Sequence, residues 1–264
     1  MLNRVLVAFI EEKDVEYLTK YSKVIKEHYP DAEIVGMFIH SVVDEDEFKE
    51  FMAADDLYRL KIKNIDREYQ KITKSEKERS ERIEKTFLSM MEGSKFYNMI
   101  GDSSEILLEE LKFFDLAILA KSNELTHEEK KLLNTHHKPV ILVPELENYS
   151  LEKIMLADDQ KIGANKALFN FMEIFSNIIE FTAVTVNGDQ KIDTEELKVY
   201  MEKAGKKIKR EFLKGEVHEI ILECSKNYDL IIMGDLKHSI MLEKAIREPG
   251  IKIIESVKKP IFIA

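Results

Sequence analysis

One stretch, a helical pattern followed by a strand pattern, occurs twice along the chain. Residues 105–119 read EILLEELKFFDLAIL and residues 219–233 read EIILECSKNYDLIIM, with eight of fifteen positions identical at an offset of 114 residues. In each copy an amphipathic helical pattern is followed by an aspartate and then by four or five consecutive apolar residues. An unbroken apolar run is typical of a parallel strand buried on both faces. The pattern therefore predicts an internal repeat of one helix and one buried strand.

Similar patterns extend over the rest of the first half. Apolar runs at 4–10 and 33–40 flank a helical pattern at about 14–28, and further strands are expected near 95–99 and at 140–143. Capping boxes at Asp102 with Glu105 and at Thr126 with Glu129 predict where two helices begin. Because a helix separates each pair of successive strands, the connections are expected to be right-handed crossovers between parallel strands.

The second half repeats this order from residue 153. Strands are expected at about 153–157, 181–186, 211–213, 230–233 and 261–264, and further helices at about 163–179, 194–207 and 249–257. Residues 145–150 are polar and suit a short linker. The sequence thus predicts an α/β protein of two tandem, doubly wound, five-stranded parallel sheets that resemble a Rossmann fold. The predicted domains are 1–146 and 151–264.

A charged insert at about 44–92 interrupts the first domain. Of the 49 residues from 44 to 92, 25 are charged, and none is glycine or proline. Apolar residues spaced by three or four predict two helices, with Ser75 and Glu78 placed as a capping box between them. The offset of 149 between Ala8 and Ala157 exceeds the 114 of the repeat by 35 residues, which measures the insert. An ordinary solvated helical face and a coiled coil that binds a partner are both compatible with this segment.

The composition narrows the class of protein. The chain has 264 residues, 44% hydrophobic and 34% charged, and a net charge of −10, which argues against binding to nucleic acid or to an anionic membrane. No apolar run reaches the roughly 20 residues needed to span a bilayer, and residues 1–10 lack the pattern of a signal peptide. The single Cys224 excludes an intramolecular disulfide. We expect a cytoplasmic protein with no nucleic-acid partner and no membrane partner.

The order of elements, together with LADDQ at 156–160, DLIIMG at 229–234 and KKPIFIA at 258–264, resembles the universal stress protein family in its tandem form. The resemblance covers both halves apart from the insert. It implies five parallel strands with helices on both faces, and a ligand site at the carboxyl ends of the strands. Some members of the family bind ATP there and others do not. The short linker and the exposed sheet edges predict that the halves pack through their last strands or neighbouring helices, as an intramolecular pseudo-dimer, and a homodimer of the chain is left open.

The glycine pattern of the nucleotide-binding members is only partly present after the repeated strand at 230–233. Gly234 matches the first glycine, whereas Lys237 replaces the second, and Arg247 and Glu248 replace a Gly-Ser pair. Glycines allow backbone amides to approach phosphates, so these substitutions predict a degenerate site. The charges of Lys237 and Arg247 could still hold a phosphate, but Glu248 would repel it. Asp159 matches the aspartate that the resemblance places against adenine.

The first half departs further from this pattern. Ile10 replaces the aspartate, Ala120 replaces the first glycine, and the loop after the repeated strand is about seven residues shorter than in the second half. No phosphate site is expected in this half. ATP in the second domain is the one cofactor that the resemblance suggests, with Asp159, Gly234, Lys237 and Arg247 as the candidate binding residues.

The other residues that could bind a metal or take part in catalysis lack the neighbours that such a site needs. His127, His136 and His137 have no acid or thiol beside them at a recognised ligand spacing, so no metal site is expected. Cys224 lies on the repeated helix and is interpreted as a partly buried, unreactive thiol. Asp158 and Asp159 have no nucleophile motif nearby, which favours a capping or ligand-contact role over acid–base catalysis. No catalytic residue is predicted.

Three functional hypotheses follow. The favoured one is a non-catalytic stress-response protein that acts as a binding or regulatory module with a degenerate nucleotide site. The second is an ATP-binding sensor with slow hydrolysis at the second-half site. The third is a scaffold whose helical insert recruits a partner protein. The substitutions at Lys237, Arg247 and Glu248 separate the first two hypotheses, and the insert motivates the third.

Overall fold

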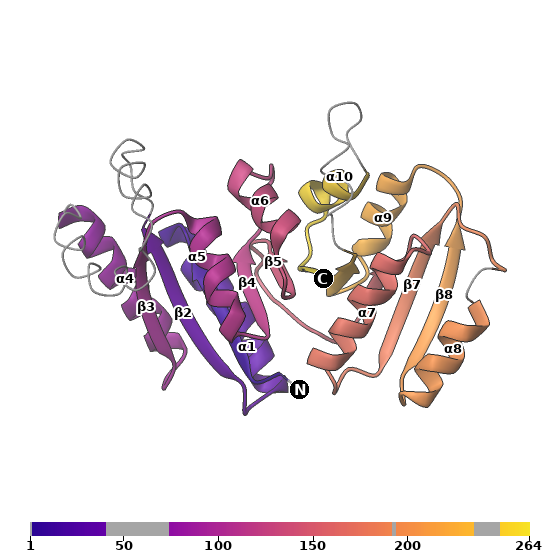
Figure 1. Cartoon of the computed structure of the whole chain (residues 1–264), viewed down its shortest axis with the longest axis horizontal. Helices are drawn as coiled ribbons and strands as arrows, with labels where there is room; N and C mark the ends of the chain where they lie inside the picture. The colour runs from indigo at the N-terminus through magenta and orange to yellow at the C-terminus, as the bar shows by residue number, and fades with distance from the viewer. Residues whose placement is uncertain (1, 41–73, 192–193, 235–248) are drawn as a thin grey trace, which may run out of the picture.

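A computed structural model of the chain describes residues 2–40, 74–191, 194–234 and 249–264. The strands of this part form one sheet in the order β3-β2-β1-β4-β5-β10-β9-β6-β7-β8, which crosses the whole molecule in Figure 1. The first half supplies β1 (Arg4–Phe9), β2 (Glu33–His40), β3 (Lys95–Ile100), β4 (Leu116–Ala120) and β5 (Val140–Val143). The second half supplies β6 (Ile154–Ala157), β7 (Glu180–Val186), β8 (Lys207–Leu213), β9 (Leu230–Met233) and β10 (Ile261–Ile263).

The sheet is parallel within each half and antiparallel at the junction. Each half places its strands in the same order, third, second, first, fourth and fifth, as predicted for a doubly wound α/β fold. The two halves meet where β10 pairs antiparallel with β5, with Phe262 opposite Ile141. The sequence predicted contact through the last strands or neighbouring helices, and the structure shows this strand pairing, which joins the two expected sheets into one. The boundaries 1–146 and 151–264 stay a prediction.

Helices cover both faces of the sheet. One face carries α1 (Val15–His28), α4 (Lys74–Met90), α7 (Ile162–Ile174) and α8 (Thr194–Lys203). The opposite face carries α5 (Ser103–Glu110), α6 (His127–Thr135), α9 (Val217–Ser225) and α10 (Pro249–Ser256). Each layer of helices buries a continuous apolar cluster against the strands. Among the described residues, no helix is both long enough and apolar enough to cross a membrane.

Contacts beyond the strand pair also join the halves. The linker is fixed by Tyr149, whose hydroxyl donates to the carbonyl oxygen of Pro144 at 2.8 Å and whose ring meets that of Tyr21 with a centroid separation of 5.3 Å. Asn177 of the second half donates its backbone N–H to the hydroxyl of Tyr29 at 3.2 Å. The Tyr29 ring packs edge-on against Phe175 at 5.6 Å. The two halves therefore share a packed interface on the face that carries α1 and α7.

Three predicted boundaries were wrong. The helix expected at 163–179 ends at Ile174, and the helix expected to reach residue 207 ends at Lys203. The strand expected at 211–213 begins at Lys207, because it pairs with β7 along seven residues. The structure describes α4 from Lys74 onward, and the side chain of Ser75, the predicted cap, lies outside the described residues.

The other predicted helix starts have different outcomes. The capping box at Thr126 and Glu129 is confirmed. At the predicted box of Asp102 and Glu105, the Asp102 carboxylate accepts the backbone N–H of Glu105. Most of the charged insert, residues 44–73, lies outside the described residues.

Candidate functional site

The predicted nucleotide site lies at the carboxyl ends of β6 and β9, which are neighbours in the sheet. Asp159 follows β6, and its side chain is 57% exposed. One carboxylate oxygen accepts the backbone N–H of Lys161 at 3.0 Å, and the other lies 3.5 Å from the Lys161 ammonium. Lys237 and Arg247 lie outside the described residues. The structure thus places two of the four predicted residues, Asp159 and Gly234, at the same edge of the sheet.

Gly234 is closely packed against the start of α7. A Cβ atom at this position would lie 2.7 Å from the carbonyl carbon of Gly163 and 3.0 Å from the backbone nitrogen of Ala164. Real Cβ atoms do not approach backbone atoms so closely, so only glycine fits here without a shift of the helix. The close contact between β9 and α7 is therefore enough to explain the glycine.

The neighbouring carboxylate, Asp158, is buried in an ion pair. Its Oδ2 accepts from the Arg210 guanidinium at 2.7 Å and from the Thr185 hydroxyl at 3.0 Å, while its Oδ1 accepts the backbone N–H of Gln160 at 2.8 Å. The Asp158 and Arg210 side chains are only 3% and 8% exposed. The guanidinium also lies over the ring of Phe212, at 5.2 Å from its centroid. Its Nε and Nη1 atoms have no hydrogen-bond partner among the described residues.

The two adjacent aspartates therefore have different surroundings. Asp158 anchors the end of β6 to β8, and Asp159 faces solvent beside Lys161. They do not form the paired carboxylates of an acid–base site. Arg210 and Thr185 were not among the residues predicted from the sequence. The alternation in KIKREF at 207–212 could have indicated Arg210. Lys207 and Lys209 are exposed, whereas Ile208 and Arg210 alternate with them and point to the other, less exposed face of the strand.

The loops at this edge are tied together by side-chain amides. The Gln160 amide donates to the carbonyl oxygen of Asp189 at 2.7 Å and accepts the Asp189 backbone N–H at 2.8 Å. The Asn187 amide makes the same two bonds with Gly215, at 2.7 and 3.0 Å. Gln160 and Asn187 both have positive φ, at 57° and 58°, which these bonds help to hold. The ends of β6, β7 and β8 are thus linked through their own loops.

Aromatic residues occupy the corresponding positions of the first half. The strand registers match Phe9 with Asp158 and Phe96 with Arg210. The rings of Phe9 and Phe96 stack at 6.1 Å, and Phe87 from α4 meets Phe9 edge-on at 5.6 Å. A Cβ atom on Gly36 would lie 2.6 Å from the Phe96 ring, so this glycine makes room for the cluster. The buried ion pair of the second half is therefore replaced by an aromatic cluster in the first half.

The carboxyl edge of the first half is covered by α4. Arg79 donates to the carbonyl oxygen of Ile10 at 3.0 Å, and Arg82 holds the Glu12 carboxylate with two bonds of 2.6 and 2.8 Å. Glu76 lies 3.6 Å from the buried His40, and burial lowers the pKa of this imidazole. The start of α4 is thereby fastened across the ends of β1 and β2.

The histidines and Cys224, the other candidate residues, show no features of a metal site or a reactive thiol in the described part of the chain. The buried His136 ring makes a 2.8 Å hydrogen bond with the carbonyl oxygen of Lys138. In the described part of the chain, no group of three or more His, Cys, Asp or Glu residues is placed to hold a metal ion. The thiol of Cys224 is partly buried, and burial raises its pKa, which agrees with an unreactive thiol. The side chain of His127 lies outside the described residues.

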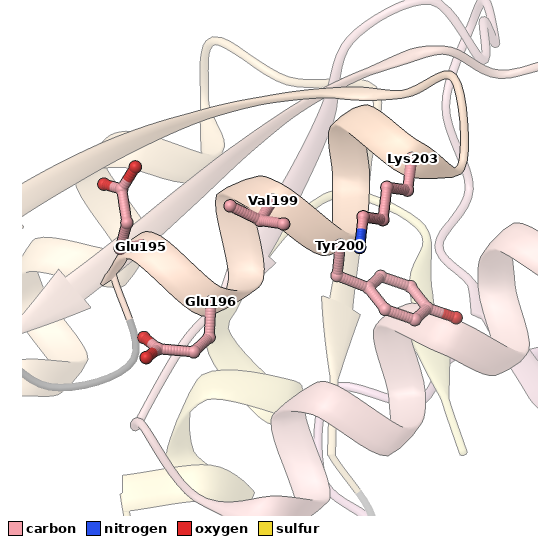
Figure 2. A pocket seen from close by; sticks show the side chains of 5 residues that line it. All are labelled: Glu195, Glu196, Val199, Tyr200 and Lys203. Atoms are coloured by element: carbon pink, nitrogen blue, oxygen red, sulfur yellow. The ribbon is translucent and has the colours of Figure 1, made fainter.

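A shallow hollow of about 320 Å³ lies on the outer side of α8 (Figure 2). It is lined by Glu195, Glu196, Val199, Tyr200 and Lys203, all from this one helix. A ligand pocket normally encloses most of its ligand between several elements. The hollow therefore differs from the candidate site at the strand ends, where three loops converge.

Comparisons with known proteins identify the fold. No family model and no curated protein matches the sequence. A universal stress protein from Archaeoglobus fulgidus DSM 4304 aligns with a TM-score of 0.61 at 16% identity, over 99% of this chain and 96% of that chain. A Pseudomonas aeruginosa UCBPP-PA14 protein assigned to the same family aligns with a TM-score of 0.61 at 12% identity, over 99% and 92%. The cytoplasmic domain of a prokaryotic cation chloride cotransporter aligns with a TM-score of 0.50 at 11% identity, over 100% and 95%.

These identities are low, and the likeness is one of fold. The resemblance of the sequence to universal stress proteins is confirmed at this level, over nearly the whole chain.

Proposed function

We propose that the chain is a stress-response protein of the universal stress protein kind, which acts as a non-catalytic binding or regulatory module. Its nucleotide site is degenerate under this proposal. The observation that carries the proposal is the packing at the second-half edge. Gly234, the one matching glycine, is in backbone contact with α7, and the buried carboxylate of Asp158 is neutralised by Arg210.

The described residues do not fit ATP well. They offer an adenine nucleotide the exposed carboxylate of Asp159, which is already bonded to Lys161. A charge-assisted hydrogen bond contributes about 1.5–3 kcal/mol. A micromolar complex needs about 8 kcal/mol. Phosphate binding would have to come from Lys237 and Arg247, without the backbone amides that glycines expose. The alternative of an ATP sensor with slow hydrolysis rests on those two residues.

A scaffold is the second candidate, and one observation favours it. The part of the insert that the structure describes, α4, is fastened to the first half by Arg79 and Arg82. A partner that bound the insert would therefore be coupled to the first-half sheet. The same fold occurs as the cytoplasmic domain of a cation chloride cotransporter, so it is used as a component of a larger protein elsewhere.

Mass spectrometry of small molecules released from the purified, undialysed chain tests the proposal. We expect no adenine nucleotide at a level near one per chain. Stoichiometric ATP or ADP would contradict a degenerate site and would support the sensor. Release of a different compound at that level would identify the ligand that the module binds.

A further inference from the structure

The helix α8 forms one end of the molecule (Figure 1). It precedes β8, the last strand of the sheet. Among its described side chains, Leu197 and Met201, one helical turn apart, are buried. On its flank, the Tyr200 ring packs against Phe169 of α7 with 4.5 Å between the ring centroids. The side of α8 opposite Leu197 and Met201 faces solvent.

This solvent-facing side carries apolar residues. Val199 lies two residues from both Leu197 and Met201, which is about 200° around the helix from each and therefore opposite the buried face. Its exposed fraction is 41%, and that of the neighbouring Tyr200 is 48%. Both residues line the hollow in Figure 2. The described side chains of α4, the helix at the other end of the same layer, include no exposed large apolar residue. The exposed apolar surface is thus a feature of the second half and not of the repeated fold.

Charges of opposite sign lie on either side of Val199. Glu195 is four residues before it and Lys203 four residues after it, so the three share one face of the helix. Both charged residues line the same hollow. The lysines of the adjacent β8 pair with glutamates, whereas in the described part of the chain Glu195 and Lys203 form no ion pair. The helix dipole favours each charge at its own end of α8, but it gives no reason for the apolar residues between them.

We propose that this surface joins two copies of the chain through the residues that line the hollow, Glu195, Glu196, Val199, Tyr200 and Lys203. A two-fold axis through Val199 sets the two α8 helices antiparallel, with Val199 of one copy against Val199 of the other. Glu195 and Lys203 each lie about 6 Å along the helix from that axis. The rotation therefore brings Glu195 of each copy opposite Lys203 of the other, so that two ion pairs form at once.

A second copy fits this surface better than an unrelated partner does. A purely acidic or purely basic partner would attract one end of α8 and repel the other. The surface is self-complementary under a two-fold rotation, which is what an isologous dimer requires. One helix from each copy buries less area than a standard protein–protein interface, so the dimer is weak. We expect a dissociation constant on the order of 100 μM, which rises with salt concentration.

Sedimentation equilibrium of the full chain at low salt, from about 10 μM to about 500 μM, measures this association. The wild type should shift from monomer toward dimer over this range. Glu195→Lys and Lys203→Glu each place two pairs of like charges in the dimer, and each should raise the dissociation constant roughly tenfold or more. Lys198→Glu is the matched control, because it makes the same change of charge at an exposed position of α8 outside the hollow. Its dissociation constant should stay within about threefold of the wild-type value.

An equimolar mixture of the two single variants Glu195→Lys and Lys203→Glu gives the most specific result. In the mixed dimer, one copy has lysine at positions 195 and 203 and the other has glutamate at both. Each contact then joins opposite charges again. The mixture should therefore recover the association of the wild type, although neither variant associates as well alone.

Three results would overturn the proposal. The first is a wild type that stays monomeric over this range of concentration. The second is a dimer that both single variants leave intact, because the copies would then meet through another surface. The third is a mixture that associates no better than the single variants, because the two charges would then not face each other. Both changed residues are exposed, so each variant should unfold at the wild-type temperature, which separates loss of association from loss of the fold.

Discussion

At the scale of single residues, Arg210 marks the largest chemical difference between the halves. It forms a buried ion pair with Asp158, where the first half has Phe96 stacked on Phe9. Removing one partner of such a pair leaves a buried charge without compensation. We predict that Arg210→Met lowers the free energy of unfolding by about 3 kcal/mol, measured by denaturant unfolding.

The double variant Asp158→Leu/Arg210→Met is the matched control. Replacing a whole buried pair by apolar side chains is often neutral, and the first half already uses an apolar cluster at these positions. The double variant should therefore recover most of the lost stability. A double variant that is less stable than Arg210→Met would contradict this account of the pair.

Single residues also show what the sequence could reveal about the site. Gly234 and Asp159 could be found from motif spacing, and both lie at the predicted edge. The spacing could not tell which of the two adjacent aspartates turns inward. That choice depends on Arg210 and Thr185, which come from other strands and are joined to Asp158 only by the strand registers. The fixed orientation of Asp158 is thus a tertiary property.

At the scale of elements, long apolar runs and capping boxes were reliable guides. The ten strands in the part of the chain that the structure describes were all predicted, and Thr126 marks the start of α6. The end of α7 was missed because tertiary packing stops it. Phe175 leaves the helix and packs against Phe262 of β10 and Tyr29 of the first half, at centroid separations of 6.2 and 5.6 Å. The local sequence contains no stop signal that would replace those contacts.

Lys121, which follows β4 and donates to the carbonyl oxygen of Glu255, predicts a pH dependence of stability because it is partly buried. The pKa of Lys121 is about 8 in the folded chain, whereas an unfolded chain keeps the proton up to about pH 10.5. Between these values the unfolded state binds more protons, so raising the pH favours the folded state. We predict that the wild type gains about 1–2 kcal/mol of stability relative to Lys121→Met between pH 8 and 10.5.

Denaturant unfolding of both chains at pH 7, 8, 9 and 10 measures this difference. Other lysines titrate alike in the two proteins and cancel. The difference should be constant below about pH 7.5 and rise above pH 8. A difference that stays constant would mean that Lys121 has an ordinary pKa in the folded chain, and one that falls with pH would mean that folding raises this pKa.

At the scale of the whole molecule, the internal repeat predicted two similar halves, and the structure joins them into one sheet through β5 and β10. The joining covers two sheet edges that would otherwise be exposed. The sequence indicated that last strands or nearby helices would meet, but not which. Ile141 and Phe262 both lie in short apolar runs. Such a run does not show whether the edge of its strand pairs with another strand or is covered by a helix.

The account as a whole depends on a second-half site that does not bind a phosphate chain well. Isothermal titration with ATP tests this most directly, with the wild type, Asp159→Ala, and a triple variant, Lys237→Gly/Arg247→Gly/Glu248→Ser, that restores the family glycine pattern. We predict that the wild type binds more weakly than about 100 μM, which is about 5.5 kcal/mol. Asp159→Ala should change this little, and the triple variant should bind more tightly than the wild type. Low-micromolar binding by the wild type that is abolished by Asp159→Ala would contradict the account and establish the ATP sensor.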